Sequence, residues 1–565
     1  MGMDEPGDAL TRFQELLDDE LCTWPSRPAL HTRANAVDQW PKPITALTQD
    51  LVALPQERGL GVAFSRVLGV ADDNGPWTWN GVFYGWYTYA VEPAAAMADN
   101  LPGWSRAAVY GDYFGVDEDP SADVTAPAAK TDPLQLARIG RNFVAALRGY
   151  PAQSRAYHAE AAARLRMDRA RDWSAEPDWA LRQRLLAHHD EAVRYRVPHV
   201  LASVISAALF KKLNETVAPL VGEGAEALVT QAVTGVGGIH LREATSAMGE
   251  VARGTRSRER FLEEFGFRGF NEFELSARPW FDDPEGLDRL IAASGGADRG
   301  PDRGTARGTG PGTDPAAQRD EARARLRKAA GWRWPLVDRL LRMTENHMRW
   351  RENGKVPMAI ATHSIRLVVR ESARRLTERG RLASPEDVYH LRSSELVDEI
   401  AGRPVPDLAT SVKRRRATFE LSPDLPLPEM LDVQPGRLTT ISAQRWHSLG
   451  VLPPSEPDAG GARLEGVGGS GGQCTGRARI VWDPDEVELE DGDVIVARGT
   501  DSAWTVLFYQ ANAVIVDVGG PMSHSAIAAR EIGIPCVLNV KDGTTRIREG
   551  QRITVDGTAG VVHLH

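Results

Sequence analysis

The spacing of hydrophobic and polar residues divides the 565-residue chain into stretches with different hydrophobic periodicity. From about residue 43 to 285, and again from about 321 to 396, apolar stripes recur with the period of a helix between charged faces. The longest apolar run, residues 197–210, is too short to span a bilayer and predicts a buried helix. This pattern predicts a large, mainly helical domain over residues 1–455.

Residues 294–319 interrupt the helical pattern. They are rich in Gly, Asp, Arg, Pro and Thr and almost free of large apolar residues, so they predict a mobile loop. Helical patterning then resumes. One start signal within it is the segment 384–387, where Ser384 offers a cap and Pro385 the first helical position.

After about residue 451 the pattern changes to short β-branched runs separated by turn residues. A linker is expected over 456–465, and a compact α/β domain over 466–565. The fold class is therefore multidomain, α plus α/β. Five strands are predicted, at residues 479–481, 493–496, 513–516, 536–538 and 553–555.

One helix start in this domain carries candidate chemistry. A buried strand leads into Gly519-Gly520, where the backbone can turn sharply, and Ser523 is a natural N-cap. A short helix follows and should stop at Gly533. His524 therefore lies in the first turn of that helix.

This position suits a phosphoryl carrier. Free N–H groups and the helix dipole stabilise an anion there, by about 0.3–1 kcal/mol from the dipole alone. Neutral imidazole, the nucleophilic form, is also favoured beside a helix N-terminus. A lone histidine at the end of a loop is the other interpretation of the pattern.

The segment also resembles a known signature. Gly519-Gly520-x-x-Ser523-His524-x-Ala-Ile-x-x-Arg530-Glu-x-Gly-Ile-Pro resembles the active-site motif of the swivelling domain of phosphoenolpyruvate-utilising enzymes, a superfamily that includes rifampicin phosphotransferase. The resemblance implies a swivelling β/β/α phosphohistidine domain. It implies that His524 carries the phosphoryl group, with Gly519, Gly520, Ser523 and Arg530 supporting it.

The rifampicin phosphotransferase branch is similar over more of the chain, from about residue 32 to 565. Residues 500–508 and 265–275 are similar to two of its segments, although Phe267 stands where a histidine is usual. The second segment implies substrate-binding roles for Arg268 and Glu272.

Arg351-Glu352-x-x-Lys355 matches the Arg-Glu-x-x-Lys motif of this branch. On a helix, Arg351 and Lys355 would repel each other, and a bound anion would relieve that repulsion. A solvated basic face neutralised by Glu345 and Glu352 is the alternative. The resemblance implies that the basic residues meet the phosphohistidine and the acceptor, and we expect Glu352 to take the acceptor's proton.

An aromatic cluster lies near the start of the helical region. It contains Trp77, Trp79, Phe83, Tyr84, Trp86, Tyr87 and Tyr89. These residues could form a hydrophobic core, because aromatic side chains bury large areas wherever they lie. The alternative is a wall of the substrate cavity, with Trp79, Tyr84 and Trp86 as binding residues.

Charge and cysteine content limit the partners and the cellular location that the sequence predicts. A net charge of −10 gives no reason to expect nucleic acid as the partner. Cys22, Cys474 and Cys536 lie far apart and form neither a disulfide framework nor a metal pattern. Neither a signal sequence nor a membrane segment is recognisable. A reducing, cytoplasmic location and no metal site are expected.

Relatives in this branch carry an ATP-grasp domain that charges the histidine, and no nucleotide loop is recognisable ahead of the similarity. We therefore expect no cofactor on this chain alone, with ATP and Mg entering only through a separate ATP-grasp protein. The predicted function is phosphotransfer from His524 to a hydroxyl of a small, specialised-metabolite substrate. A dehydratase or cyclase acting by phosphorylation and elimination is the alternative, and a non-catalytic binding protein is the third interpretation.

Overall fold

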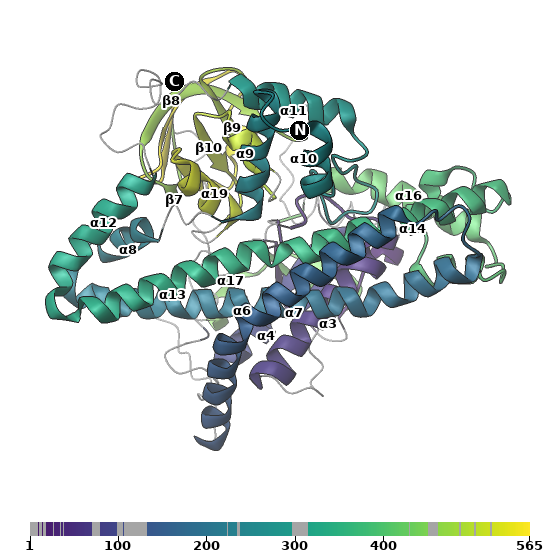
Figure 1. The fold of residues 1–565 in the computed structure, drawn as a ribbon, viewed down its shortest axis with the longest axis horizontal. Helices are drawn as coiled ribbons and strands as arrows, with labels where there is room; N and C mark the ends of the chain where they lie inside the picture. The colour runs from purple at the N-terminus through teal and green to yellow at the C-terminus, as the bar shows by residue number, and fades with distance from the viewer. Residues whose placement is uncertain are drawn as a thin grey trace. The chain divides into compact units, whose positions relative to one another are not determined.

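The structure is a computed structural model of the chain (Figure 1). It describes residues 10, 14, 19–25, 28–33, 36–37, 39–70, 79–98, 106, 133–222, 224–233, 238–296, 315–425, 427–428, 430–449, 462–484, 487–501, 504–519 and 523–565.

The chain divides into two compact units. The first comprises Met1–Pro198, Asn271–Ala277 and Val356–Ser455, and the second comprises His199–Phe270, Arg278–Lys355 and Glu456–His565. The helical region thus contributes to both units. The linker expected at 456–465 stays a prediction, because residues 456–461 lie outside the described part of the chain.

The first unit combines long helices with a five-stranded sheet of order β2-β3-β1-β4-β5, in which neighbouring strands are antiparallel. The strands are β1 (Ala29–Thr32), β2 (Asn80–Phe83), β3 (Trp86–Ala90), β4 (Met430–Gln434) and β5 (Arg437–Thr439). The helical elements are η1 (Asp19–Leu21), α2 (Ala46–Thr48), η2 (Gln49–Ala53), α3 (Leu54–Val62), η3 (Ala63–Leu68), α4 (Val91–Ala98), α6 (Pro133–Ala170), η5 (Pro385–His390), α15 (Ser393–Ile400), α16 (Leu408–Leu421), η6 (Ser422–Asp424) and α17 (Ala443–Leu449).

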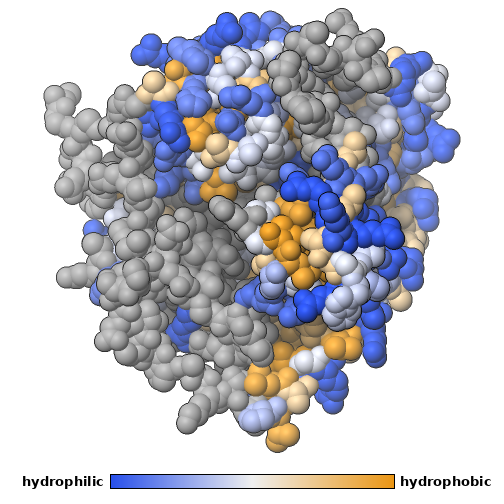
Figure 2. Space-filling view, turned by 90° about the vertical axis from the view of Figure 1, so that its left-hand side faces the viewer, coloured by the Kyte–Doolittle hydropathy of each residue, from blue (hydrophilic) through white to orange (hydrophobic). Residues whose placement is uncertain are grey.

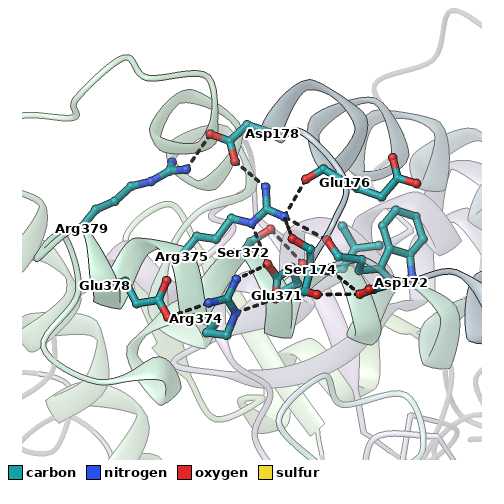
Figure 3. A network of polar contacts seen from close by, with 12 residues as sticks. Asp172, Ser174, Glu176, Asp178, Glu371, Ser372, Arg374, Arg375, Glu378 and Arg379 are labelled. Carbon is teal, nitrogen blue, oxygen red and sulfur yellow. Dashed lines mark hydrogen bonds and ion pairs between the residues drawn. The ribbon is translucent and has the colours of Figure 1, made fainter.

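Two further helices reach the boundary between the units. Helix α7 (Asp178–Val221) contains the apolar run that predicted a buried helix, and α14 (Lys355–Glu378) begins at the boundary. The connection between α6 and α7 is fixed to α14 by Arg375 (Figure 3). Its guanidinium donates to Asp178 Oδ1 at 2.8 Å and to the carbonyls of Trp173, Ser174 and Glu176 at 2.7–3.2 Å. Such multiple charge-assisted bonds hold the turn rigidly.

The second unit contains an eight-stranded sheet of order β6-β13-β12-β8-β9-β10-β11-β7. Strands β8 to β11 pair in parallel in the middle, and the flanking pairs are antiparallel. The strands are β6 (Arg463–Glu465), β7 (Val467–Ser470), β8 (Gln473–Ile480), β9 (Asp493–Ala497), β10 (Ala513–Val516), β11 (Cys536–Leu538), β12 (Arg552–Asp556) and β13 (Val561–Leu564). The five predicted strands correspond to β8 through β12, which confirms the α/β class of this region.

Some helices of the second unit precede this sheet domain in the chain, and three short ones lie within it. They are α8 (Ala225–Ala232), α9 (His240–Ala252), α10 (Arg258–Phe265), α11 (Pro284–Gly296), α12 (Pro315–Ala330), η4 (Gly331–Arg333), α13 (Trp334–Asn353), α18 (Thr505–Phe508), α19 (His524–Ile532) and α20 (Gly543–Arg546). Figure 1 shows α9, α10 and α11 beside the sheet. They share one buried cluster with it, in which Met248, Phe261 and Trp280 join Phe508 and Val514.

Two expectations about the helical region need correction. The five-stranded sheet was not predicted, because its central strand β1 pairs with β4 about 400 residues later in the chain. The loop expected at 294–319 is also too long at both ends. Its first residues complete α11, and residues from Pro315 onward start α12, where a proline fits the first turn. Residues 297–314 lie outside the described residues.

Among the helices that the structure describes, none combines the length and apolar character needed to cross a membrane. The face drawn in Figure 2 carries small hydrophobic patches between hydrophilic residues. Single exposed apolar side chains are normal on protein surfaces and by themselves indicate no partner.

Candidate active site

His524 begins α19, as the sequence predicted. Ser523 is the N-cap and accepts a hydrogen bond from the amide of Ala526 at 3.4 Å, and Gly533 closes the helix in a left-handed conformation with φ 81°. Gly519 has φ 154°, and a Cβ at this position would lie 3.3 Å from Ser523 Oγ. Glycine is therefore suited to the turn that delivers the chain from β10 to the helix.

Both ring nitrogens of His524 face polar groups in the second unit. The side chain is 5% exposed, Nε2 lies 3.1 Å from Thr505 Oγ1, and Nδ1 lies 3.7 Å from Glu352 Oε2. A carboxylate beside Nδ1 favours a proton on that nitrogen. We therefore assign the Nδ1–H tautomer, in which Nε2 keeps its lone pair and accepts from the Thr505 hydroxyl.

Glu352 lies in a cluster of opposite charge. Its carboxylate is 3.8 Å from Arg351 Nε and 4.0 Å from Lys355 Nζ. Burial alone would raise the pKa of Glu352, but Lys355, His524 and Arg351 together hold it well below its usual value. Two cations thus lie beside the carboxylate that faces the imidazole, and positive charge in excess of one anion suits a dianionic phosphoryl group.

The segment that carries this cluster is the junction of α13 and α14, and two side chains fix it. Asn353 accepts from the amide of His240 at 2.9 Å and donates to the carbonyl of Gly238 at 2.8 Å. The His199 ring donates through Nδ1 to the carbonyl of Arg351 at 3.1 Å. These bonds satisfy backbone groups at a point where two helices meet.

Arg530, predicted to support the phosphohistidine, lies on the same helix as His524. It donates to the carbonyl of Gly469 at 3.0 Å, which ties α19 to β7. Burial lowers the pKa of Arg530 to about 10, and the charge of Arg351 acts in the same direction. Gly520, the remaining predicted support residue, lies outside the described residues.

The predicted substrate-binding residues are divided between the two units. Arg268 is buried in the second unit, whereas Glu272 is buried in the first, where its carbonyl accepts from Arg366. Trp79, in the first unit, stacks on Phe64 with ring centroids 4.8 Å apart. Their substrate roles stay predictions.

Two of the predicted aromatic wall residues belong to a core cluster of the first unit. Tyr84 forms the turn between β2 and β3 with φ 51°. Trp86 donates from its indole nitrogen to the carbonyl of Ser422 at 2.8 Å, and Arg33 lies 4.0 Å above its ring. Both residues are therefore packed in the first unit, and their substrate roles stay predictions.

Sequence reasoning missed three contributors, namely Thr505, Asn353 and His199. Thr505 lies in the segment at 500–508 that resembles the rifampicin phosphotransferase branch, so a signal for it was present. Asn353 occupies an unspecified position of the Arg-Glu-x-x-Lys motif. His199 lies in an apolar run, and its backbone contact has no sequence signature.

Comparison with known proteins agrees with this geometry. Residues 489–560 match the PEP-utilising enzyme mobile domain, and residues 255–352 match the rifampicin phosphotransferase fourth domain. The second unit therefore contains a region that matches the mobile domain of PEP-utilising enzymes, with His524 inside this match and Glu352 at the end of the other. Both matches confirm the resemblance drawn from the sequence and relate the chain to phosphotransferases.

Similarity to individual proteins agrees with these two matches. The chain is 29% identical to the rifampicin phosphotransferase of Streptomyces sviceus over 342 residues, which cover 59% of this chain and 37% of that protein. It is 32% identical over 301 residues to an uncharacterized protein of Mycobacterium tuberculosis, which covers 53% of this chain and 30% of that protein. It is 30% identical over 308 residues to the prodigiosin synthesizing transferase PigC of Serratia marcescens, which covers 54% of this chain and 32% of that protein. The match spans about a third of the length of these relatives.

Proposed function

We propose that the chain is a phosphotransfer component that carries a phosphoryl group on His524 and delivers it to a hydroxyl group of a small molecule. The observation that carries this proposal is the pairing of His524 with the Arg351–Glu352–Lys355 cluster. A nucleophilic imidazole at a helix N-terminus, with a carboxylate at one nitrogen and two cations nearby, suits capture and release of a phosphoryl group.

The transfer proceeds by exchange of one bond. The acceptor oxygen forms a bond to phosphorus while the Nε2–phosphorus bond breaks, and the electron pair of that bond returns to Nε2. The proton on Nδ1 remains there, held by Glu352. Arg351 and Lys355 neutralise charge on the phosphoryl oxygens, and the hydroxyl proton passes by way of the Glu352 carboxylate to water.

The phosphoryl donor is proposed to be a separate ATP-grasp protein that uses ATP and Mg. The acceptor is proposed to be a specialised metabolite, which is supported by relatives whose names refer to rifampicin and to prodigiosin. The same chemistry would serve a dehydratase or cyclase, because a phosphorylated hydroxyl is a leaving group.

Reconstitution tests the proposal. The chain, an ATP-grasp partner, ATP and candidate alcohols are incubated, and the products are analysed by mass spectrometry. A gain of phosphate is expected for a phosphotransferase and a loss of water for a dehydratase, and either product must disappear with His524→Ala. Full turnover by His524→Ala would overturn the proposal and favour a binding role.

A further inference from the structure

Arg196 is a buried cation in the first unit. It lies on α7, is 5% exposed, and donates from Nη1 to Gln39 Oε1 and from Nη2 to the Tyr89 hydroxyl, each at 3.1 Å. Nε has no hydrogen-bond partner among the described residues. Both acceptors are neutral, so the guanidinium charge is hydrogen-bonded but not compensated.

No carboxylate in the described ranges forms an ion pair with Arg196. Glu57 is the acidic residue that influences the neighbouring Tyr87. Burial raises the pKa of Glu57 to about 7, so it is only partly ionised at neutral pH, and the cation that acts on it is Arg58. A buried charge without a counter-ion costs several kcal/mol. Water could satisfy the free N–H group but could not neutralise the charge.

Aromatic side chains and further polar atoms surround the guanidinium partners. Tyr87 lies edge-on to Tyr89 with ring centroids 5.4 Å apart, and Trp40 packs 5.7 Å from Tyr87. Asn80 donates to the Tyr87 hydroxyl. Trp40 Nε1 and Asn80 Oδ1 are buried without hydrogen-bond partners among the described residues. Together with Arg196 Nε, these atoms leave two donors and one acceptor in this region that a ligand or water would satisfy.

The local backbone supports a binding role. Helix α3, which supplies Gln56 as the partner of Gln39, is flanked by the π-helical segments η2 and η3. Such π-turns are frequent at functional sites. Gly59 brings α3 against Arg196, because a Cβ there would lie 2.6 Å from Arg196 Cβ. Tyr89 is only half-buried, so the cluster is not sealed from solvent.

We propose that Arg196, Trp40 and Tyr89 bind the carboxylate of an aromatic acid. Arg196 offers its Nε–H, and the indole N–H of Trp40 is a second donor. The rings of Trp40, Tyr87 and Tyr89 provide contact for the apolar part of the ligand. The assignment of this acid as the acceptor substrate rests on the proposed phosphotransfer function, but the anion site itself does not.

Calorimetric titration with two probes of matched size tests the site. The full-length chain is titrated with 2-naphthoate and with the neutral 2-naphthalenemethanol. Naphthoate should bind about ten- to a hundredfold more tightly, the usual worth of a hydrogen bond to a charged group. Inorganic phosphate is included as a competitor, and it should displace naphthoate poorly because it lacks the apolar part. Displacement by phosphate at equal concentration would overturn the aromatic-acid assignment.

Two variants test whether Arg196 is responsible for the preference for naphthoate. Arg196→Gln should abolish the preference for naphthoate. Arg194→Gln is the matched control, because Arg194 lies on the same helix but pairs with Glu160 on the surface, and it should bind like the wild type. Retention of the preference by Arg196→Gln, or loss of it in Arg194→Gln, would overturn the proposal.

A measurement on the unaltered protein covers the case in which Arg196→Gln fails to fold. Naphthoate should raise the melting temperature of the wild type more than the alcohol does at the same concentration. Equal shifts would overturn the proposal. Because neither ATP nor a partner is present, these results are independent of whether His524 accepts a phosphoryl group.

Discussion

Replacing Glu352 by glutamine isolates the contribution of its charge. The substitution keeps the size of the side chain but removes the carboxylate that lies 3.7 Å from His524 Nδ1. When Nε2 attacks phosphorus, positive charge develops on the ring. Two unit charges at this distance interact by about 4 kcal/mol at an effective dielectric constant of about 20. If half of the charge has developed in the transition state, about 2 kcal/mol is lost, or about thirtyfold in rate.

Chemical phosphorylation measures this rate without a protein partner. Wild type and Glu352→Gln are incubated with potassium phosphoramidate, and phosphohistidine is followed by ³¹P NMR. The chain has 13 histidines, so His524→Ala provides the blank. The wild type should show phosphorylation at Nε2. Glu345→Gln is the matched control on α13, because Glu345 pairs with Arg323 instead.

The pH dependence of the variant adds a second check. The folded-state pKa of Glu352 is held well below its usual value of 4.5, so its interaction is fully present above that value and is lost only as pH falls through the lower folded pKa. The rate ratio between wild type and Glu352→Gln should therefore be constant from about pH 8 to 9, above the range in which imidazoles ordinarily titrate. A ratio near one, or one that grows across this range, would refute the role assigned to the carboxylate.

Substitutions at Arg351, Lys355 and Ser523 test other parts of the site. With an ATP-grasp partner present, His524 should still be labelled in the variants Arg351→Ala and Lys355→Ala. Transfer of the phosphoryl group to the acceptor should fall about ten- to a thousandfold in single-turnover measurements. An unchanged transfer rate would contradict the role of these two residues. Ser523→Ala should weaken the start of α19 by about 0.5–2 kcal/mol and speed hydrogen exchange of the Ala526 amide, and Ser523→Asp should restore protection. Equal exchange in Ser523→Ala and wild type would show that the cap is not used.

The local structure around His524 could be predicted because its determinants are adjacent in sequence. Ser523, His524 and Gly533 specify the start and end of one short helix by rules that act within a few residues. The apolar runs that became β9 and β10 are buried along their whole length, as central parallel strands are. These two strands and this helix could therefore be predicted without knowledge of the tertiary fold.

Long-range pairing could not be predicted in the same way. The contact between Glu352 and His524 joins residues 172 positions apart, and nothing in the local pattern of either segment indicates it. The resemblance pointed to Arg351 and Lys355 but gave no geometry. The pairing of β1 with β4 likewise depends on a partner strand far along the chain.

The most direct test of the central claim is a pulse–chase on His524. The chain is labelled by the partner and [γ-³²P]ATP, freed of nucleotide, and mixed with the acceptor. The account predicts an acid-labile, base-stable label on the protein that disappears at least as fast as the complete reaction turns over, with product forming at the same rate. Label that persists while product forms, or product formation by His524→Ala, would contradict the assignment of His524 as the phosphoryl carrier.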